Sequence, residues 1–234
     1  MAHAPSFETR RITIDKKRTW NLFEKSLTPE ASEAARQAIM QVTEMPERYI
    51  DKGGAGVVYR LENGLCVKVI ENRHFSPNKH LLDLRNSVPV EAAIQQFLTP
   101  LRVKEVRVPY CLGFSVVEDY KIPSLILMEE LPAVNLQQAI NKTVPFPEAF
   151  KVGTFMDGLY DFVAEMQGDY AIAHDDLEAR NVMIDKTTGL AYVIDFGRAI
   201  RLNMIKEEQK RDQYESADFK NLEKIEKTLK NIHG

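Results

Sequence analysis

The sequence predicts an α+β protein with two lobes, a β-rich lobe followed by a helix-rich lobe. Three observations support this. Asn63-Gly64 stands between two β-rich runs, residues 57–61 and 65–70, which is a strong hairpin signal. Apolar residues recur at near-helical spacing beyond Pro147. The last segment, residues 206–232, has the charged and amphipathic character of a surface helix.

Composition narrows the class of protein. With 234 residues, 44% hydrophobic and 28% charged, the chain can bury a sizeable core and is neither a disordered protein nor a collagen. Its net charge of -3 gives no chain-wide basic field, so we expect no nucleic-acid partner. Cys66 and Cys111 are too few for a disulfide framework, which indicates a reducing compartment.

Targeting signals are lacking in the sequence. No run approaches the roughly 20 apolar residues of a membrane span, and the N-terminal stretch has no apolar core of a signal peptide. We therefore expect a protein that is made in the cytoplasm and has no membrane span. A specialised secretion system would leave no such mark, so secretion into a host cell stays open.

The first third of the chain begins with an extension, residues 1–47, that we expect to carry one helix. Residues 1–18 are predicted to be a tail or an edge segment. The helix begins with Thr28 as N-cap and Pro29 at its first position, and it continues to about Glu44. The extension could pack on the β-rich lobe or bind a substrate.

The remaining elements follow in order. The β-rich lobe, residues 48–132 with the hinge, continues beyond the hairpin. We expect a helix over 89–98 and two further strands. The helix-rich lobe, residues 133–234, contains a short strand pair joined through residues 185–189. The predicted strands are 109–117, 124–129, 181–184 and 191–194.

Phosphate-binding features occur in the first hairpins. Gly53, Gly54 and Gly56 lie in an opening turn, where glycine lets backbone N–H groups approach a phosphate closely. A plain tight turn would have the same glycines. Lys68 lies on the returning strand, which would bring its ammonium beside this loop, although a lone strand lysine is usually just solvated.

A third element decides between these interpretations. In His174-Asp175-Asp176 and the residues that follow, Asp176 can orient a hydroxyl nucleophile or accept its proton. Asn181 and Asp195 present hard oxygen ligands that suit Mg²⁺, at neighbouring ends of the short strand pair. A phosphate cradle, a lysine, metal ligands and a carboxylate are the set that phosphoryl transfer needs.

These motifs, in this order, resemble the protein-kinase-like superfamily over residues 49–218. The glycine loop is similar to G-x-G-x-x-G with Asp51 in the first glycine's place, and Cys66-Val67-Lys68 resembles the Ala-x-Lys strand. The resemblance implies a bilobal kinase-like fold with a truncated helical C-lobe, and ATP and Mg²⁺ as cofactors bound between the lobes. It makes Asp176 and Lys68 catalytic, and Asn181 and Asp195 the metal ligands.

The resemblance also assigns the nucleotide contacts. Glu91 is the best match to the helix glutamate that pairs with Lys68, and a solvated helix charge is the alternative. Val58 matches the valine above the adenine. Met128 resembles a gatekeeper, so the backbone of Glu129 and Leu131 would meet the adenine. Asn135 would lie near the ribose, or would be a surface cap. The implied nucleotide-binding set is Gly53, Gly54, Gly56, Val58, Lys68, Glu91, Glu129, Leu131 and Asn135.

Two departures from the family narrow the class. Asp175 stands where regulated kinases carry the arginine that meets a phosphorylated activation loop, and an aspartate would repel that phosphate. The stretch after Gly197 has no Ala-Pro-Glu segment and is too short for a full activation loop. Such truncation resembles minimal kinases, including small bacterial effector kinases of the OspG and NleH type. Asp218 would then brace the catalytic loop from below.

The expected function is therefore an ATP-dependent protein kinase of minimal size, with Ser or Thr favoured over Tyr as acceptor. Its partners would be a protein substrate, which could be a host protein if the chain is a secreted effector, and an activating partner. Two other functions stay open. One is a small-molecule phosphotransferase, although the chain lacks the large acceptor lobe of such enzymes. The other is a kinase-fold binding module with weak activity.

Overall fold

The computed structural model describes residues 9–13, 19–23, 28–41, 48–53, 56–62, 64–70, 87–104, 106–116 and 122–233. They form an α+β protein, which confirms the expected fold class at this level. The chain divides into two compact units. The first unit runs up to residue 97 and also takes in 110–130, and the second comprises 98–109 together with the chain from 131 on.

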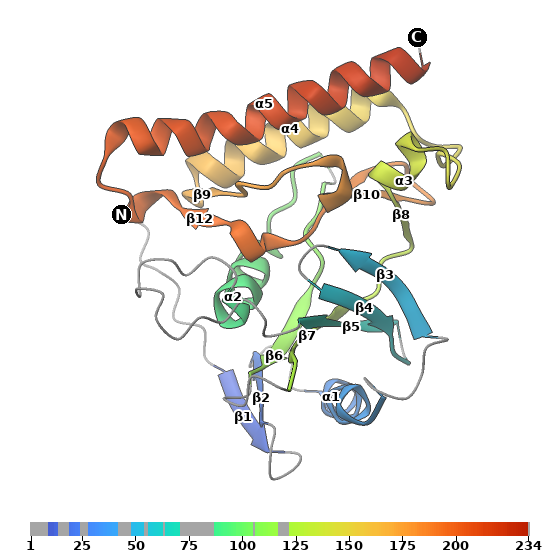
Figure 1. The fold of residues 1–234 in the computed structure, drawn as a ribbon, viewed down its shortest axis with the longest axis vertical. Helices are drawn as coiled ribbons and strands as arrows, with labels where there is room; N and C mark the ends of the chain where they lie inside the picture. The colour runs from blue at the N-terminus through green and yellow to red at the C-terminus, as the bar shows by residue number, and fades with distance from the viewer. Residues whose placement is uncertain are drawn as a thin grey trace. The chain divides into compact units, whose positions relative to one another are not determined.

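The first unit is built on a seven-stranded sheet in which each neighbouring pair of strands is antiparallel (Figure 1). The strand order is β1-β2-β6-β7-β5-β4-β3. The strands are β1 (Thr9–Thr13), β2 (Thr19–Phe23), β3 (Tyr49–Gly53), β4 (Gly56–Arg60), β5 (Leu65–Ile70), β6 (Cys111–Ser115) and β7 (Ser124–Glu129).

The predicted hairpin is present as β4 and β5. The amide of Leu61 donates to the carbonyl of Leu65 at 2.8 Å, and Gly64 takes φ +70°, which L-residues with a side chain rarely adopt. Asn63, the other predicted turn residue, lies outside the described residues. The strands predicted over 109–117 and 124–129 are β6 and β7, with β6 shorter than expected.

Two helices cover opposite faces of this sheet. Alternate strand residues point to opposite faces, so Leu125 and Leu127 of β7 face one way and Ile126 the other. The first pair packs in one core with the alanines of α1 (Pro29–Gln41), whereas Ile126 packs in another with α2 (Val88–Leu98). The buried alanines of α1 are Ala31, Ala34, Ala35 and Ala38, at helical spacing.

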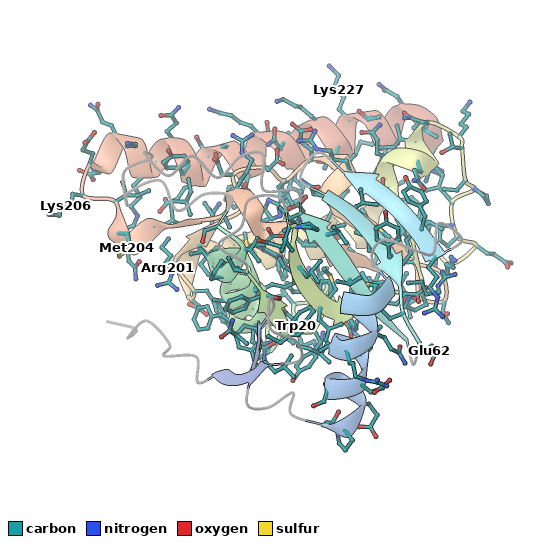
Figure 2. All side chains as sticks on the ribbon, turned by 60° about the horizontal axis from the view of Figure 1, so that its bottom comes forward. Trp20, Glu62, Arg201, Met204, Lys206 and Lys227 are labelled. Atoms are coloured by element: carbon teal, nitrogen blue, oxygen red, sulfur yellow. The ribbon has the colours of Figure 1, made fainter. Side chains whose placement is uncertain are left out.

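The N-terminal extension belongs to this unit. Its helix begins as predicted, because the hydroxyl of Thr28 accepts from the amide of Ala31 at 3.1 Å. The extension also supplies β1 and β2. β1 is an edge strand, in agreement with the edge-segment alternative for residues 1–18, whereas β2 was not predicted. Trp20 of β2 is fully buried in the core beside α1 (Figure 2). Trp20 and Leu22 of β2 and the buried alanines of α1 therefore contribute to the same core as later residues of this unit.

Residues 98–109 belong to the second unit, although the sequence-based division placed them in the β-rich lobe. The amide of Arg107 donates to the carbonyl of Ala191 at 3.1 Å, and the amide of Val193 donates to the carbonyl of Arg107 at 2.9 Å. Val106 packs so closely on α4 that a Cβ on Gly158 would lie 2.9 Å from its side chain. These contacts couple the segment to the helical unit.

The second unit is dominated by two helices that lie side by side, α4 (Val152–Gly168) and α5 (Glu208–His233) (Figure 1). Its small sheets are β11-β10-β8 and β12-β9. The remaining elements are β8 (Ala133–Asn135), α3 (Leu136–Ile140), β9 (Ile172–Ala173), η4 (Ala179–Asn181), β10 (Val182–Asp185), β11 (Ala191–Val193), η5 (Phe196–Arg198), β12 (Ile200–Arg201) and η6 (Leu202–Met204).

The helical predictions for this unit are confirmed with small shifts at their ends, and β10 and β11 are the predicted short strand pair. Within the described part of the chain, no helix combines the length and the apolar composition needed to cross a membrane.

Candidate active site

Lys68 and Glu91 form a buried ion pair within the first unit. The Nζ of Lys68 lies 2.7 Å from Oε1 of Glu91, and the two residues are 7% and 4% exposed. Lys68 is in β5, opposite Val58 of β4, and Glu91 is in the first turn of α2. The pairing expected for these two residues is therefore present, and Glu91 is not a solvated helix charge.

Gly53 and Gly56 of the predicted phosphate loop lie where β3 turns into β4. Gly53 ends β3 and Gly56 begins β4, and the two residues are paired across the strands. Gly54 lies outside the described residues. A Cβ on Gly56 would lie 2.4 Å from the carbonyl oxygen of Val69, so a backbone atom of β5 excludes a side chain here.

The predicted hinge follows β7. The amide of Glu129 donates to the carbonyl of Tyr110 at 3.0 Å, and its carbonyl accepts from the thiol of Cys66 at 3.4 Å. Leu131 follows β7 and precedes β8, and its contact with adenine stays a prediction. Burial raises the pKa of the Cys66 thiol, so this cysteine is a small buried side chain and not a reactive one.

Asp176 and Asn181 are held together in the second unit. The side-chain Nδ2 of Asn181 donates to the backbone carbonyl of Asp176 at 2.7 Å and to the Oδ2 of Asp176 at 3.0 Å. Asn181 is buried at the end of η4, directly before β10. The turn formed by residues 176–181 thus brings two of the predicted site residues into contact.

Two arginines lie next to the Asp176 carboxylate. Nη2 of Arg180 donates to Oδ1 of Asp176 at 2.8 Å, and the same guanidinium pairs with Glu178. Arg198 lies 3.9 Å from Asp176 and 3.8 Å from Asp175. Sequence reasoning missed Arg198, and its place directly after Asp195-Phe196-Gly197 was the signal that could have indicated it.

Asp195 lies close to Asn181 through the backbone. The amide of Ile194 donates to the carbonyl of Asn181 at 3.0 Å, and Val182 pairs with Val193 across the two strands. Asp195 adopts φ +64°, an uncommon conformation that aspartate tolerates better than most residues, and its side chain does not cap η5. The two predicted metal ligands thus lie at neighbouring ends of one strand pair, as expected.

Asp218 of α5 braces the residues before Asp176. Its carboxylate oxygens accept from the amides of His174 and Asp175, at 2.8 and 3.0 Å, and from the side chain of Gln167 at 3.0 Å. Burial raises the pKa of Asp218 although the His174 charge and these donors lower it. His174 is fully buried, and its Nε2 lies 2.9 Å from the carbonyl of Ile194. His174 is therefore a core residue that links the segment before Asp176 to the segment before Asp195.

Asn135 serves as a helix cap. Its Oδ1 accepts from the amides of Gln137 and Gln138 at the start of α3, and its Nδ2 donates to the carbonyl of Arg180 at 2.7 Å. These hydrogen bonds favour the interpretation of Asn135 as a helix cap over a contact with the ribose. Asn135 is buried, whereas the capping alternative in the sequence analysis was a cap at the surface.

The predicted site residues thus fall into two groups, one in each unit. Lys68, Glu91 and the glycines belong to the first unit, and Asp176, Asn181 and Asp195 belong to the second. Comparison with known proteins adds no assignment, because no family model and no curated protein matches the chain.

Proposed function

We propose that this protein is an ATP-dependent protein kinase of minimal size with a bilobal kinase-like fold, transferring the γ-phosphate of ATP to a protein hydroxyl. The observation that carries the proposal is the buried ion pair between Lys68 and Glu91. Taking two charges out of water costs several kcal/mol per ion, and apolar side chains would often serve stability as well. Because stability alone does not explain a buried ion pair with this desolvation penalty, its place beside a glycine turn supports a role in binding phosphate.

Lys68 is the group that would contact the phosphates. Its ammonium is a compact charge with three donors, and it donates to Glu91. Glu91 would hold the lysine in its extended position from α2. Gly53 and Gly56 pair where β3 turns into β4, and glycine lets backbone N–H groups at such a turn approach the same phosphates closely.

Asn181 and Asp195 would hold Mg²⁺ with ATP, and their donor chemistry fits this ion. The side-chain nitrogen of Asn181 is directed at Asp176, and no hydrogen bond to the described residues engages its Oδ1. An amide oxygen and a carboxylate are the hard ligands that Mg²⁺ prefers. When bound, the ion would neutralise charge on the phosphates.

Asp176 would orient the acceptor hydroxyl. Asn181 and Arg180 engage both of its carboxylate oxygens, so its orientation is fixed before a substrate binds. Preorganisation of this kind lowers the barrier because no reorganisation is needed during the reaction. Asp175 pairs with Arg198 instead of reading a phosphorylated loop, so activity should not require such phosphorylation.

The acceptor in this proposal is a protein, with Ser or Thr favoured over Tyr. If the chain is a secreted effector, the acceptor is a host protein and the place of action is the host cytoplasm. A small-molecule phosphotransferase and a weakly active binding module are the competing functions.

Transfer of labelled phosphate from ATP tests the proposal. The full chain is incubated with itself, with lysate protein and with a panel of metabolites, each with the wild-type protein and with Asp195→Ala. Label on lysate protein that depends on Asp195 supports a kinase. Label on a metabolite alone favours the phosphotransferase, and absence of transfer in all arms favours the binding module.

Calorimetry measures Mg²⁺-dependent ATP binding and so tests the assignment of Asp195 as a metal ligand without any phosphoryl transfer. Asp195→Ala should lose Mg²⁺-dependent ATP binding while its unfolding temperature stays close to that of the wild type. Asp169→Ala, at the exposed C-terminal end of α4, is the matched control and should keep it. Unchanged Mg²⁺-dependent binding in the Asp195 variant would show that the ligand assignment is wrong.

A further inference from the structure

A small surface pocket of the second unit lies beside the turn that holds Asp176. Its volume is about 210 Å³, and its apolar residues are Ile140 of α3, Ala179 of η4 and Ile225 of α5. Ala179 and Ile225 are buried, so the pocket has an apolar base. Sites for small molecules are larger, at about 300–1,000 Å³. The pocket therefore fits one or two side chains of an extended polypeptide better than a whole metabolite.

The position of the pocket connects it to the proposed acceptor site. Glu178 and Ala179 line it, and both lie in the same turn as Asp176. Arg180 links the two places, since its guanidinium pairs with Glu178 and with Asp176. A polypeptide seated in the pocket would rest on the turn that positions the Asp176 carboxylate.

The wall formed by α5 is positively charged. Lys224 lines the pocket, and its Nζ donates to the side chain of Asn221 at 3.2 Å. Lys220 and Lys227 lie four residues before and three residues after it on the same side of the helix, and Lys227 projects outwards from α5 (Figure 2). None of the three is ion-paired among the described residues. Two carboxylates, Glu223 and Glu226, lie between them, and Glu226 is paired with Lys230. The surplus positive charge complements an acidic partner.

We propose that the pocket formed by α3, η4 and α5 binds the acceptor protein through an acidic segment that carries an aliphatic residue. The aliphatic side chain would occupy the base formed by Ile140, Ala179 and Ile225. Acidic residues beside it would meet the lysines of α5. This inference rests on the proposed function, since it names the acceptor segment that the kinase would recognise.

Methyl NMR of the full-length protein tests the inference without any phosphoryl transfer. The probe is a short synthetic peptide of alternating glutamate and leucine with a central serine, and its counterpart has lysine in place of glutamate. With isoleucine methyl labels, the acidic peptide should shift the signals of Ile140 and Ile225. The signals of Ile94 and Ile126, which are buried in the first unit, should not move. The lysine peptide should leave all four unchanged.

Variants then test the two parts of the pocket. Lys224→Glu should weaken binding of the acidic peptide by roughly tenfold or more, because like charges would oppose each other. Thr228→Trp should block the pocket without changing charge, since Thr228 lines it. Lys210→Glu is the matched control, an exposed lysine of α5 about 21 Å along the helix from Lys224. It should leave binding unchanged.

The outcomes separate this inference from the proposed function. Peptide binding that is lost in Lys224→Glu, without transfer to any protein, would support the pocket and contradict the kinase. Phosphoryl transfer without any shift of Ile140 and Ile225 would overturn the pocket and leave the kinase standing. Equal binding of both peptides, or preferential binding of a DNA oligonucleotide, would also overturn it.

Discussion

The ammonium of Lys68 lies 2.7 Å from the carboxylate of Glu91, although 23 residues separate them in the chain. One comes from the middle of a buried strand and the other from the helix that covers the same sheet. Both side chains are almost wholly removed from water. Each therefore compensates part of the charge of the other.

Removal of one partner should destabilise the first unit strongly. Glu91→Leu removes the carboxylate that pairs with the buried Lys68 ammonium, which costs about 3–5 kcal/mol of unfolding free energy. The double variant Lys68→Met with Glu91→Leu should recover most of that loss, while ATP binding stays absent. Urea unfolding and calorimetry measure the two properties. If the single variant is as stable as the wild type, the pair is not buried in solution.

Gly56→Ala should destabilise the protein because its Cβ would meet the carbonyl of Val69 at 2.4 Å. We expect a loss of about 1–3 kcal/mol, the usual range for overpacking. Gly153→Ala is the control, since nothing lies within 4 Å of its Cβ and alanine favours helix. The unfolding temperature should fall for Gly56→Ala. It should rise or stay unchanged for Gly153→Ala. Equal unfolding temperatures would contradict the close approach of β4 and β5.

Asp176→Asn should separate catalysis from nucleotide binding. The proposed acceptor carboxylate is lost, so kcat should fall by roughly 10²–10⁴. ATP affinity should stay unchanged, because Asp176 is assigned to the acceptor. Asp169→Asn serves as control, since it changes an exposed aspartate at the end of α4 and leaves Asp176 in place. Near wild-type transfer by Asp176→Asn would show that another group orients the hydroxyl.

Acid should remove a stabilising contribution of Asp185. Burial raises the pKa of this carboxyl, but donors from Thr188, Thr187 and Tyr192 together lower it below the ordinary value of 3.8. A lowered pKa in the folded state means that stability is present above pH 3.8 and is lost as the pH falls through the folded pKa.

The variant Asp185→Asn keeps an acceptor oxygen but has no charge to titrate. It should be less stable than the wild type by about 1–2 kcal/mol at neutral pH. The difference should shrink below pH 3.8. Urea unfolding over a pH series measures this. A difference that grows in acid would contradict the direction of the pKa shift.

Local features of the chain could be predicted from residue order alone. Thr28 caps α1, and Gly64 closes the β4–β5 turn. In each case the interacting groups are a few residues apart, so the backbone conformation that these residues prefer already brings them together. The strand pair that carries Asn181 and Asp195 follows the same rule, because a short hairpin sets its register.

Other relationships needed the tertiary structure because they join residues distant in sequence. Asp218 meets the amide of His174 across 44 residues, and residues 98–109 leave the sheet unit to pair with β11. Strand β2 pairs with β6, and its Trp20 and Leu22 join a core with residues much later in the chain, such as Leu125 and Leu127. Such contacts depend on how buried surfaces fit together and on which polar groups then need partners, and neither is encoded within a single stretch of the chain.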